Sequence, residues 1–405
     1  MRREKRGAVF VLVHVCLLLL SSCTFLPVRT TSCYTVIKQA PFIGNLIFVK
    51  HNTVYAFSSN IVEIRSIANF TGSVANLHIS PDGKYLLDPK IREAVSEELP
   101  EDAAFLFEQA VGLTTTHYLE SLDLIEIQTG AKSHIEVPEM LRAYSLKGWL
   151  DREWLLFEPV FGTIQQGFIA LPVIDTSQPK GSIFLFNPFT RQSISIVPNL
   201  PAELDPDFLI LPRWWLYPFT YSTDKQRVFF YTHTETGMSK YVLWDITNQQ
   251  VIWEEALNPV EVVEPARWSP DGKYIAYHYY DSQRLVLLDM QGTRTRIPTL
   301  SEKYVPSHDF SWSPNGQMLA FWIGDLSRKN EIMQPFEFVV YDTKTNAIIN
   351  TCIISEGTTG KFFWSPDGRF ILIAEKSHEY LLLDLQEKRA FRFNFEQGEI
   401  IGWMK

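Results

Sequence analysis

The chain has 405 residues, with 37 Lys and Arg against 46 Asp and Glu, a formal net charge of −9, and 14% aromatic residues. With 46% hydrophobic residues and only four cysteines, this composition excludes a disordered chain, a collagen and a disulfide-knit miniprotein. The acidic balance argues against broad contact with phosphate backbones, so no nucleic-acid partner is expected.

The first residues have the pattern of an export signal. A basic head at residues 2–6 precedes an apolar run at residues 8–20, which is too short for a comfortable membrane span. The sequence Leu-Ser-Ser-Cys at residues 20–23 then resembles the lipobox of bacterial lipoproteins. The resemblance implies cleavage before Cys23 and a diacylglycerol on its sulfur. An ordinary cleaved signal or an uncleaved anchor remains the alternative.

These features divide the chain into a lipoprotein signal peptide (1–22), a tether (23–40) and a folded body (41–405). Beyond Cys23, the mature chain has two thiols, Cys33 and Cys352. An exported compartment permits a disulfide between them. Because two cysteines so far apart in the sequence are weak grounds for a bond, we expect buried or free thiols instead.

The body is built from a short β-rich repeat. Trp-Ser-Pro-Asp/Asn-Gly occurs at residues 268–272, 312–316 and 364–368, Ile-Ser-Pro-Asp-Gly at 79–83, and degenerate copies at 149–157 and 221–230. Proline presets φ, Asp or Asn accepts a local backbone hydrogen bond, and Gly adopts a positive φ, so each copy predicts a hairpin. A second hairpin with an Asp or its stand-in follows each one, which gives four strands per unit.

These motifs resemble the TolB-like, PD40-repeat propellers of bacteria, with a WD40 propeller as the nearest alternative. Four-stranded units spaced by about 44–73 residues are typical of propeller blades. Six first hairpins are present, and one C-terminal strand at residues 399–403 would join three N-terminal strands at residues 46–65 in a last blade. We therefore predict an all-β, seven-bladed β-propeller, with six or eight blades as alternatives, closed without an open sheet edge.

Four insertions are predicted to lie on the propeller face opposite the Ser-Pro-Asp-Gly turns. They span residues 88–121, which include a short helix expected at residues 91–99, and residues 161–181, 198–216 and 324–335. Long loops on a rigid scaffold often carry function, so we expect this face to be the working face.

The candidate binding residues are aromatic or charged and lie in the long link into the third blade, at or just before inner strands, or, for Tyr280, in a short loop of the fourth blade. Aromatic and Arg side chains are enriched at contact hot spots. The alternative roles are inter-blade packing for the aromatic group and solvation of the channel mouth for the rest. The candidates are Arg213, Trp214, Trp215, Tyr217, Arg267, Tyr280, His308, Asp309 and Lys361.

The recurring carboxylates are interpreted as structural. Those at residues 82, 271 and 367 belong to separate hairpin turns, and those at 245, 289, 342 and 384 recur at strand ends. His233 has no Cys or His at metal-ligand spacing, so neither a metal site nor a cofactor is expected. Gly-x-Ser-x-Gly, HExxH, Walker and GxGxxG motifs are absent from the sequence.

Two functional hypotheses follow. The first is a non-enzymatic scaffold: an exported lipoprotein, held at the outer surface or in the periplasm of a bacterium by its lipid anchor, that acts as a monomer and binds an envelope protein or a glycan on the insertion face. The resemblance to TolB implies protein partners in the envelope. The second is an enzyme of glycosidase, lyase or peptidase type at the channel mouth, because acid–base residues contributed by different blades leave no linear motif.

Overall fold

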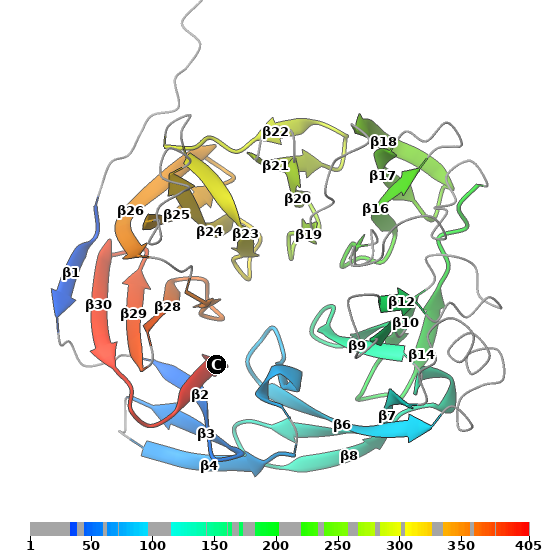
Figure 1. Cartoon of the computed structure of the whole chain (residues 1–405), viewed down its shortest axis with the longest axis horizontal. Coiled ribbons are helices and arrows are strands. Elements are labelled where there is room, and N and C mark those ends of the chain that lie inside the picture. Colours follow the sequence, from blue (N-terminus) through cyan, green and yellow to red (C-terminus); the bar gives the residue numbers. More distant parts are fainter. Residues whose placement is uncertain are drawn as a thin grey trace, which may run out of the picture.

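The computed structural model describes most of the body and a short N-terminal segment. The described ranges are 33–38, 44–59, 63–71, 73–95, 115–142, 144–159, 161–163, 170–172, 183–201, 220–233, 239–257, 266–279, 284–300, 304–325, 335–356, 360–376 and 378–404. Seven antiparallel sheets stand around a central axis as the blades of a propeller (Figure 1). The predicted fold and the count of seven blades are therefore confirmed.

The first three blades follow the predicted hairpins, with the innermost strand given first. Blade 1 consists of β5 (His78–Ile79), β6 (Tyr85–Val95), β7 (Thr115–Glu126) and β8 (Lys132–Glu136). Blade 2 consists of β9 (Tyr144–Trp149), β10 (Leu155–Pro159), β13 (Ile183–Phe186) and β14 (Ser193–Ile196), with a separate hairpin of β11 (Phe161–Thr163) and β12 (Ala170–Pro172). Blade 3 consists of β15 (Thr220–Tyr221), β16 (Arg227–His233), β17 (Ser239–Asp245) and β18 (Gln250–Leu257).

The next three blades repeat this order. Blade 4 consists of β19 (Arg267–Trp268), β20 (Tyr274–Tyr279), β21 (Arg284–Asp289) and β22 (Arg294–Arg296). Blade 5 consists of β23 (Tyr304–Trp312), β24 (Met318–Asp325), β25 (Pro335–Asp342) and β26 (Ala347–Glu356). Blade 6 consists of β27 (Phe362–Trp364), β28 (Phe370–Lys376), β29 (Glu379–Asp384) and β30 (Arg389–Asn394).

Blade 7 joins the two ends of the chain, as predicted. It consists of β31 (Glu399–Trp403), β2 (Asn45–Lys50), β3 (Thr53–Ser58) and β4 (Glu63–Asn69). β31 pairs antiparallel with β2, with Trp403 opposite Leu46. Two short 3₁₀ turns, η1 (Val74–Asn76) and η3 (Glu139–Leu141), lie in the links that follow blades 7 and 1.

The core is divided among the interfaces between blades. Seven hydrophobic clusters of described residues occur, one between each pair of neighbouring blades. Alternate residues of a strand supply the two clusters on its two sides: Leu86 packs toward blade 7 and Leu87 toward blade 2. Because each blade buries both of its faces in this way, the abundant aromatic residues are largely packing residues.

The helix expected at residues 91–99 is wrong over its described part. Residues 91–95 continue β6 and pair with residues 115–119 of β7. This pairing satisfies the backbone hydrogen bonds of the segment, so tertiary context overrides its helical spacing of apolar residues. Residues 96–99 lie outside the described residues.

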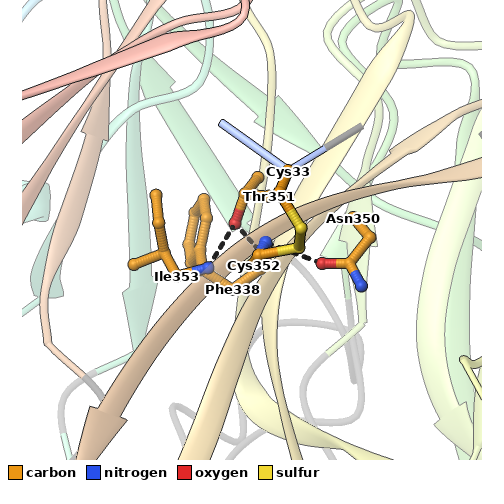
Figure 2. Close-up of a disulfide and its surroundings, with 6 residues drawn as sticks. All are labelled: Cys33, Phe338, Asn350, Thr351, Cys352 and Ile353. Carbon is orange, nitrogen blue, oxygen red and sulfur yellow. Dashed lines mark hydrogen bonds between the residues drawn. A yellow bond between two sulfur atoms is a disulfide. The ribbon is translucent and has the colours of Figure 1, made fainter. Parts of the chain in front are cut away.

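The expectation of unbonded thiols is also wrong, because Cys33 and Cys352 form a disulfide with a Cα–Cα distance of 5.0 Å. Figure 2 shows the bond, which joins the N-terminal segment to β26 of blade 5. The bulge in β26, next to the Phe338–Ile353 pair, presents Cys352 at a φ of +56°. The prediction failed because ring closure brings the two residues together, and their sequence separation of 319 gives no local signal.

The six described residues that begin at this disulfide lie in the segment predicted as a tether. β1 (Thr35–Lys38) adds a parallel fifth strand to β30 of blade 6, on its outer side (Figure 1). The Tyr34 N–H donates to the Thr351 carbonyl at 3.1 Å, and its ring is buried in the cluster between blades 5 and 6. Residues 33–38, which we call the N-terminal clasp, therefore bridge two blades from outside.

Candidate ligand-binding site in the central channel

A cavity of about 1290 Å³ lies where the first turns of the blades converge on the channel. Residues of all seven blades line it. Its charged lining is balanced in sign, with Lys147, Arg152, Lys225 and Arg267 against Asp82, Asp151, Glu153 and Asp367. Trp, Tyr, Phe and Pro residues supply much of the remaining wall, so the cavity offers apolar surface together with charges of both signs.

The turns around this cavity share one hydrogen-bond pattern. In blade 4, the buried Ser269 Oγ donates to Asp271 Oδ1 at 2.7 Å and accepts from the Tyr274 N–H at 2.9 Å. Gly272 has a φ of +69°, which glycine adopts without steric cost. Blades 1, 5 and 6 have the same arrangement around their own Ser-Pro-Asp/Asn-Gly sequences.

These bonds confirm that the repeated aspartates form turns. Burial would raise the pKa of Asp82, but hydrogen bonds from Ser80 and Lys84 lower it below its ordinary value. The same opposing causes, with Lys273 and Ser269 as donors, lower the pKa of Asp271. At the strand ends, residues 245, 289, 342 and 384 accept hydrogen bonds from backbone N–H groups of their own turns. Their carboxylates are thus already used within single hairpins.

Five tryptophans tie neighbouring inner strands together around the channel. Each indole Nε1–H donates to a carbonyl of the inner strand in the preceding blade, at distances of 3.0–3.3 Å. Examples are Trp268 to Thr220 and Trp312 to Arg267, both at 3.0 Å. Because these polar groups are paired inside the fold, the indoles serve the wall of the channel first and offer a ligand mainly their ring surface.

Blade 2 departs from the common turn, whereas blade 3 keeps its hydrogen bonds at Ser222 and Asp224 and replaces its glycine. In blade 2, Asp151 Oδ1 accepts from the backbone N–H groups of Glu153 and Trp154, both at 2.8 Å. In blade 3, Lys225 occupies the glycine position and keeps a φ of +64°. Its Nζ lies 4.4 Å from the centroid of the Trp154 ring and 3.6 Å from Asp151 Oδ2. A non-glycine residue in this conformation costs roughly 1–2 kcal/mol, and the contacts with Trp154 and Asp151 offset part of that cost.

Arg267 lies in the wall of this cavity. Its Nη1 donates to the Phe310 carbonyl at 2.6 Å, and its guanidinium lies 5.1 Å from the centroid of the Phe310 ring. Burial lowers the pKa of Arg267 and the nearby Asp309 opposes this shift, so the group remains charged at neutral pH. Asp309 is exposed on β23, near the guanidinium of Arg267.

The other predicted site residues are dispersed or undescribed. Lys361 is exposed just before β27, with its Nζ 3.8 Å from Glu399 Oε1 of blade 7. His308 belongs to β23, but its side chain lies outside the described residues. The remaining candidates also lie outside the described residues: Cys23, Arg213, Trp214, Trp215, Tyr217 and Tyr280.

Sequence reasoning missed a buried ionic cluster in blade 1, on the side that faces blade 7. Asp88 and Asp123 oppose each other on β6 and β7 and are 1% and 2% exposed. Lys90 bridges both carboxylates, while Lys132 Nζ and His134 Nδ1 contact Asp123 at 2.6 and 3.0 Å. Burial raises the pKa of Asp88. For Asp123, burial is outweighed by bonds from Lys132, His134 and Lys90, which lower its pKa.

The signals that could have found these groups were departures from pattern. Asp88 and Asp123 occupy inward positions of strands where an apolar residue is expected, and Lys225 replaces the repeated glycine. In the described part of the chain, no group of three or more His, Cys, Asp and Glu residues is placed to hold a metal ion. Within the same residues, no helix has the length and apolar character needed to cross a bilayer.

The chain is thus a seven-bladed β-propeller with a cavity at the turn end of its channel. Comparison with protein families finds a match to one described as eukaryotic translation initiation factor eIF2A, over residues 242–377. This segment is about one third of the chain and contains the three Trp-Ser-Pro-Asp/Asn-Gly copies.

Curated relatives include one of the subunits of eukaryotic translation initiation factor 3, from Drosophila willistoni and from Drosophila ananassae. Both proteins are 24% identical to this chain over 163 residues, which cover 39% of this chain and 21% and 22% of those proteins. The chain therefore spans about a fifth of the length of the curated relatives it matches.

Solved structures with related architecture share little sequence with this chain. TolB from Acinetobacter baumannii is 13% identical and has a TM-score of 0.39; the match covers 89% of this chain and 81% of the TolB chain. An oligogalacturonate lyase in complex with manganese is 10% identical, with 88% and 85% covered and a TM-score of 0.46. The β-propeller domain of Myceliophteria thermophila Cps50 (Swd1) is 11% identical, with 87% and 98% covered and a TM-score of 0.38.

Proposed function

We propose that this protein is an exported, lipid-anchored scaffold without catalytic activity that binds a segment of an envelope protein at the turn end of its channel. This end is opposite the insertion face expected from the sequence, most of whose loops lie outside the described residues. The observation that carries the binding role is the cavity. Its volume of about 1290 Å³ exceeds the roughly 300–1,000 Å³ of pockets for small molecules. A longer ligand, such as a protein segment or a glycan chain, would fill it better.

The chemistry of the lining favours binding over catalysis. Three of the four lining carboxylates, Asp82, Asp151 and Asp367, accept hydrogen bonds within their own turns. A general acid or base must be free to exchange its proton near the reacting bond. By contrast, the Lys225–Trp154 pair at the mouth combines a cation with an aromatic face, a combination suited to polypeptide recognition.

The disulfide supports export, because such bonds persist mainly in oxidising compartments. Cys33 follows the lipobox cysteine Cys23 by ten residues. Deleting residues 1–22 should leave Cys33 and Cys352 reduced in the cytoplasm, whereas the full chain should carry the bond, as read by thiol alkylation and gel shift. Reduced thiols in the full chain would contradict the proposed compartment.

Crosslinking tests the binding site directly. A photoreactive residue at Arg152, in the cavity lining, should give an adduct with a protein of the envelope, and one at Ile194, on the outer strand of blade 2, should not. Lys225→Gly should weaken the Arg152 adduct without lowering the melting temperature. Equal adducts at both positions would refute the channel site. Turnover of a glycan or peptide panel that is abolished by changing one lining carboxylate would establish the enzymatic alternative instead.

A further inference from the structure

The N-terminal clasp fixes the place where any membrane anchor must leave the propeller. Cys33 is bonded to Cys352 of blade 5, and β1 is paired with β30 of blade 6. Only nine residues lie between Cys23 and Cys33, so ten Cα–Cα steps join them. A fully extended chain of that length reaches at most about 33–36 Å.

This reach is shorter than the propeller is wide. A compact body of about 365 residues (41–405) has a radius of gyration near 21 Å, which corresponds to a diameter of roughly 50 Å. An anchor at Cys23 would have to pass around half of the ring to bring blade 2 to the bilayer. The rim of blades 5 and 6 is therefore the part of the outer edge that stays within reach of the membrane.

The same rim presents apolar side chains. Ile354 is 61% exposed, Val36 is 40% exposed and Ile37 is 36% exposed. These are three of the nine large hydrophobic residues that are exposed in the described part of the chain, and all three lie within four residues of a disulfide cysteine. Val36 and Ile37 are neighbours on β1 and project from opposite faces of the strand, so both faces of this outer edge carry an exposed apolar side chain.

Two further features suit a lipid surface. β1 is an edge strand, and one side of its backbone has no neighbouring strand among the described residues; polar headgroups can supply hydrogen-bond partners there. Lys388 and Arg389 are exposed beside it, with Arg389 opposite Thr35 in the β1–β30 register. Basic residues at this level can contact anionic headgroups.

We propose that the clasp rim, formed by Val36, Ile37 and Ile354 around the disulfide, rests on the membrane that holds the anchor. This inference depends on the lipid anchoring of the proposed function. The propeller then stands on its edge, with its channel axis along the membrane plane. Both ends of the channel stay open, so a partner can reach the turn-end cavity without lifting the protein from the bilayer.

The experiment uses the full chain, processed and anchored in vesicles that contain anionic lipid. With Cys23 lipidated and Cys33 bonded to Cys352, an added cysteine is the single free thiol of the mature protein. Ile37→Cys and, as the matched control on the opposite rim, Ile194→Cys (42% exposed, on β14) are labelled with an environment-sensitive fluorophore. Quenching by lipids that carry a nitroxide near the headgroup is then compared, and peptide mapping verifies the native disulfide.

The inference expects several-fold stronger quenching at residue 37 than at residue 194, and weaker quenching at residue 37 after Ile354→Asp. If Cys23→Ser releases the protein from membranes but the anchored protein shows equal quenching at residues 37 and 194, the proposed orientation is overturned and the anchor stands. Protein that stays on membranes after Cys23→Ser would overturn the anchor itself. If unlabelled Ile37→Cys protein forms a disulfide-linked dimer through residue 37 and the labelled protein shows no quenching there, this edge belongs to a second copy of the chain and the inference is overturned.

Discussion

The disulfide gives the sharpest test of how the N-terminal clasp is held against the ring. Replacing Cys33 or Cys352 with Ser removes a crosslink that spans a sequence separation of 319 residues. The chain-entropy relation for a loop of this size gives about 5.7 kcal/mol at 25 °C, and native disulfides commonly contribute about 3 kcal/mol. At about 2.1 cal/mol/K of unfolding entropy per residue, a propeller of about 365 residues should lose between about 4 and 7 °C in Tm.

The backbone at Cys352 provides a matched comparison. Its φ of +56° lies in the left-handed region, which a residue with a side chain occupies at a cost of about 1 kcal/mol. Cys352→Gly and Cys352→Ser remove the same disulfide, but only glycine relieves this cost. Cys352→Gly should therefore be the more stable of the two by about that amount, while both fall below the oxidised parent.

Differential scanning calorimetry on the mature chain, with and without reductant, measures these differences. Reduced parent protein should melt close to Cys33→Ser, and reductant should leave the variants unchanged. Hydrogen exchange should show faster exchange in β1 of the variants. An oxidised parent that melts at the same temperature as Cys33→Ser would refute the view that the clasp stabilises the ring. Equal melting of Cys352→Gly and Cys352→Ser would refute the backbone argument.

Three further changes test the packing and electrostatics. The buried Tyr34 Oη has no hydrogen-bond partner in the described structure, so Tyr34→Phe should raise the free energy of unfolding by about 1 kcal/mol in urea titrations; destabilisation would contradict this. Gly316→Ala should cost more than Gly368→Ala, because the added Cβ would lie 2.6 Å from Asp271 Oδ1 at Gly316 but no closer than 3.7 Å to any neighbour at Gly368; equal melting temperatures would count against the clash. Asp123→Asn should cost about 2 kcal/mol at pH 7 and more than Asp88→Asn. A carboxylate whose pKa is lower in the folded than in the unfolded state stabilises the fold at a pH above its unfolded pKa, and this stabilisation is lost as the pH falls through its folded pKa. The loss of stability caused by Asp123→Asn should therefore become smaller in acid. A loss that stays unchanged down to pH 3 would refute the lowered pKa of Asp123.

The fold was predictable because its signals are local. A Trp-Ser-Pro-Asp-Gly sequence contains the serine, the carboxylate and the glycine that build its turn, and the observed hydrogen bonds at Ser269 and Asp271 join residues at most five positions apart. Repetition of that turn predicts repeated blades. One C-terminal strand and three N-terminal strands without an inner strand predict the closure that β31 and β2 make. The misread segment at residues 91–95 lacks such a turn, and its pairing with β7 decides its structure.

The candidate site was predictable only in part, because its contacts join residues from different blades. Arg267 could be placed near the channel from its position beside an inner strand, yet its contact with Phe310 depends on how blades 4 and 5 meet. The Lys225–Trp154 contact likewise joins the turns of blades 3 and 2. In a ring, the residues that line the axis come from every unit, so each blade can follow the repeat while the set of residues at the centre leaves no linear motif.

The same reasoning explains why departures from the repeat are informative at the channel. A repeated turn with glycine is already stable, and Lys225 replaces that glycine although its positive φ carries a conformational cost. Its Nζ then lies between the ring of Trp154 and the carboxylate of Asp151, at the lining of the cavity. Nine other described non-glycine residues also have a positive φ, so the backbone conformation by itself does not mark a site. What distinguishes Lys225 is that its charge lies beside Trp154 and Asp151 in the cavity wall, which is the contact on which the proposed binding role draws.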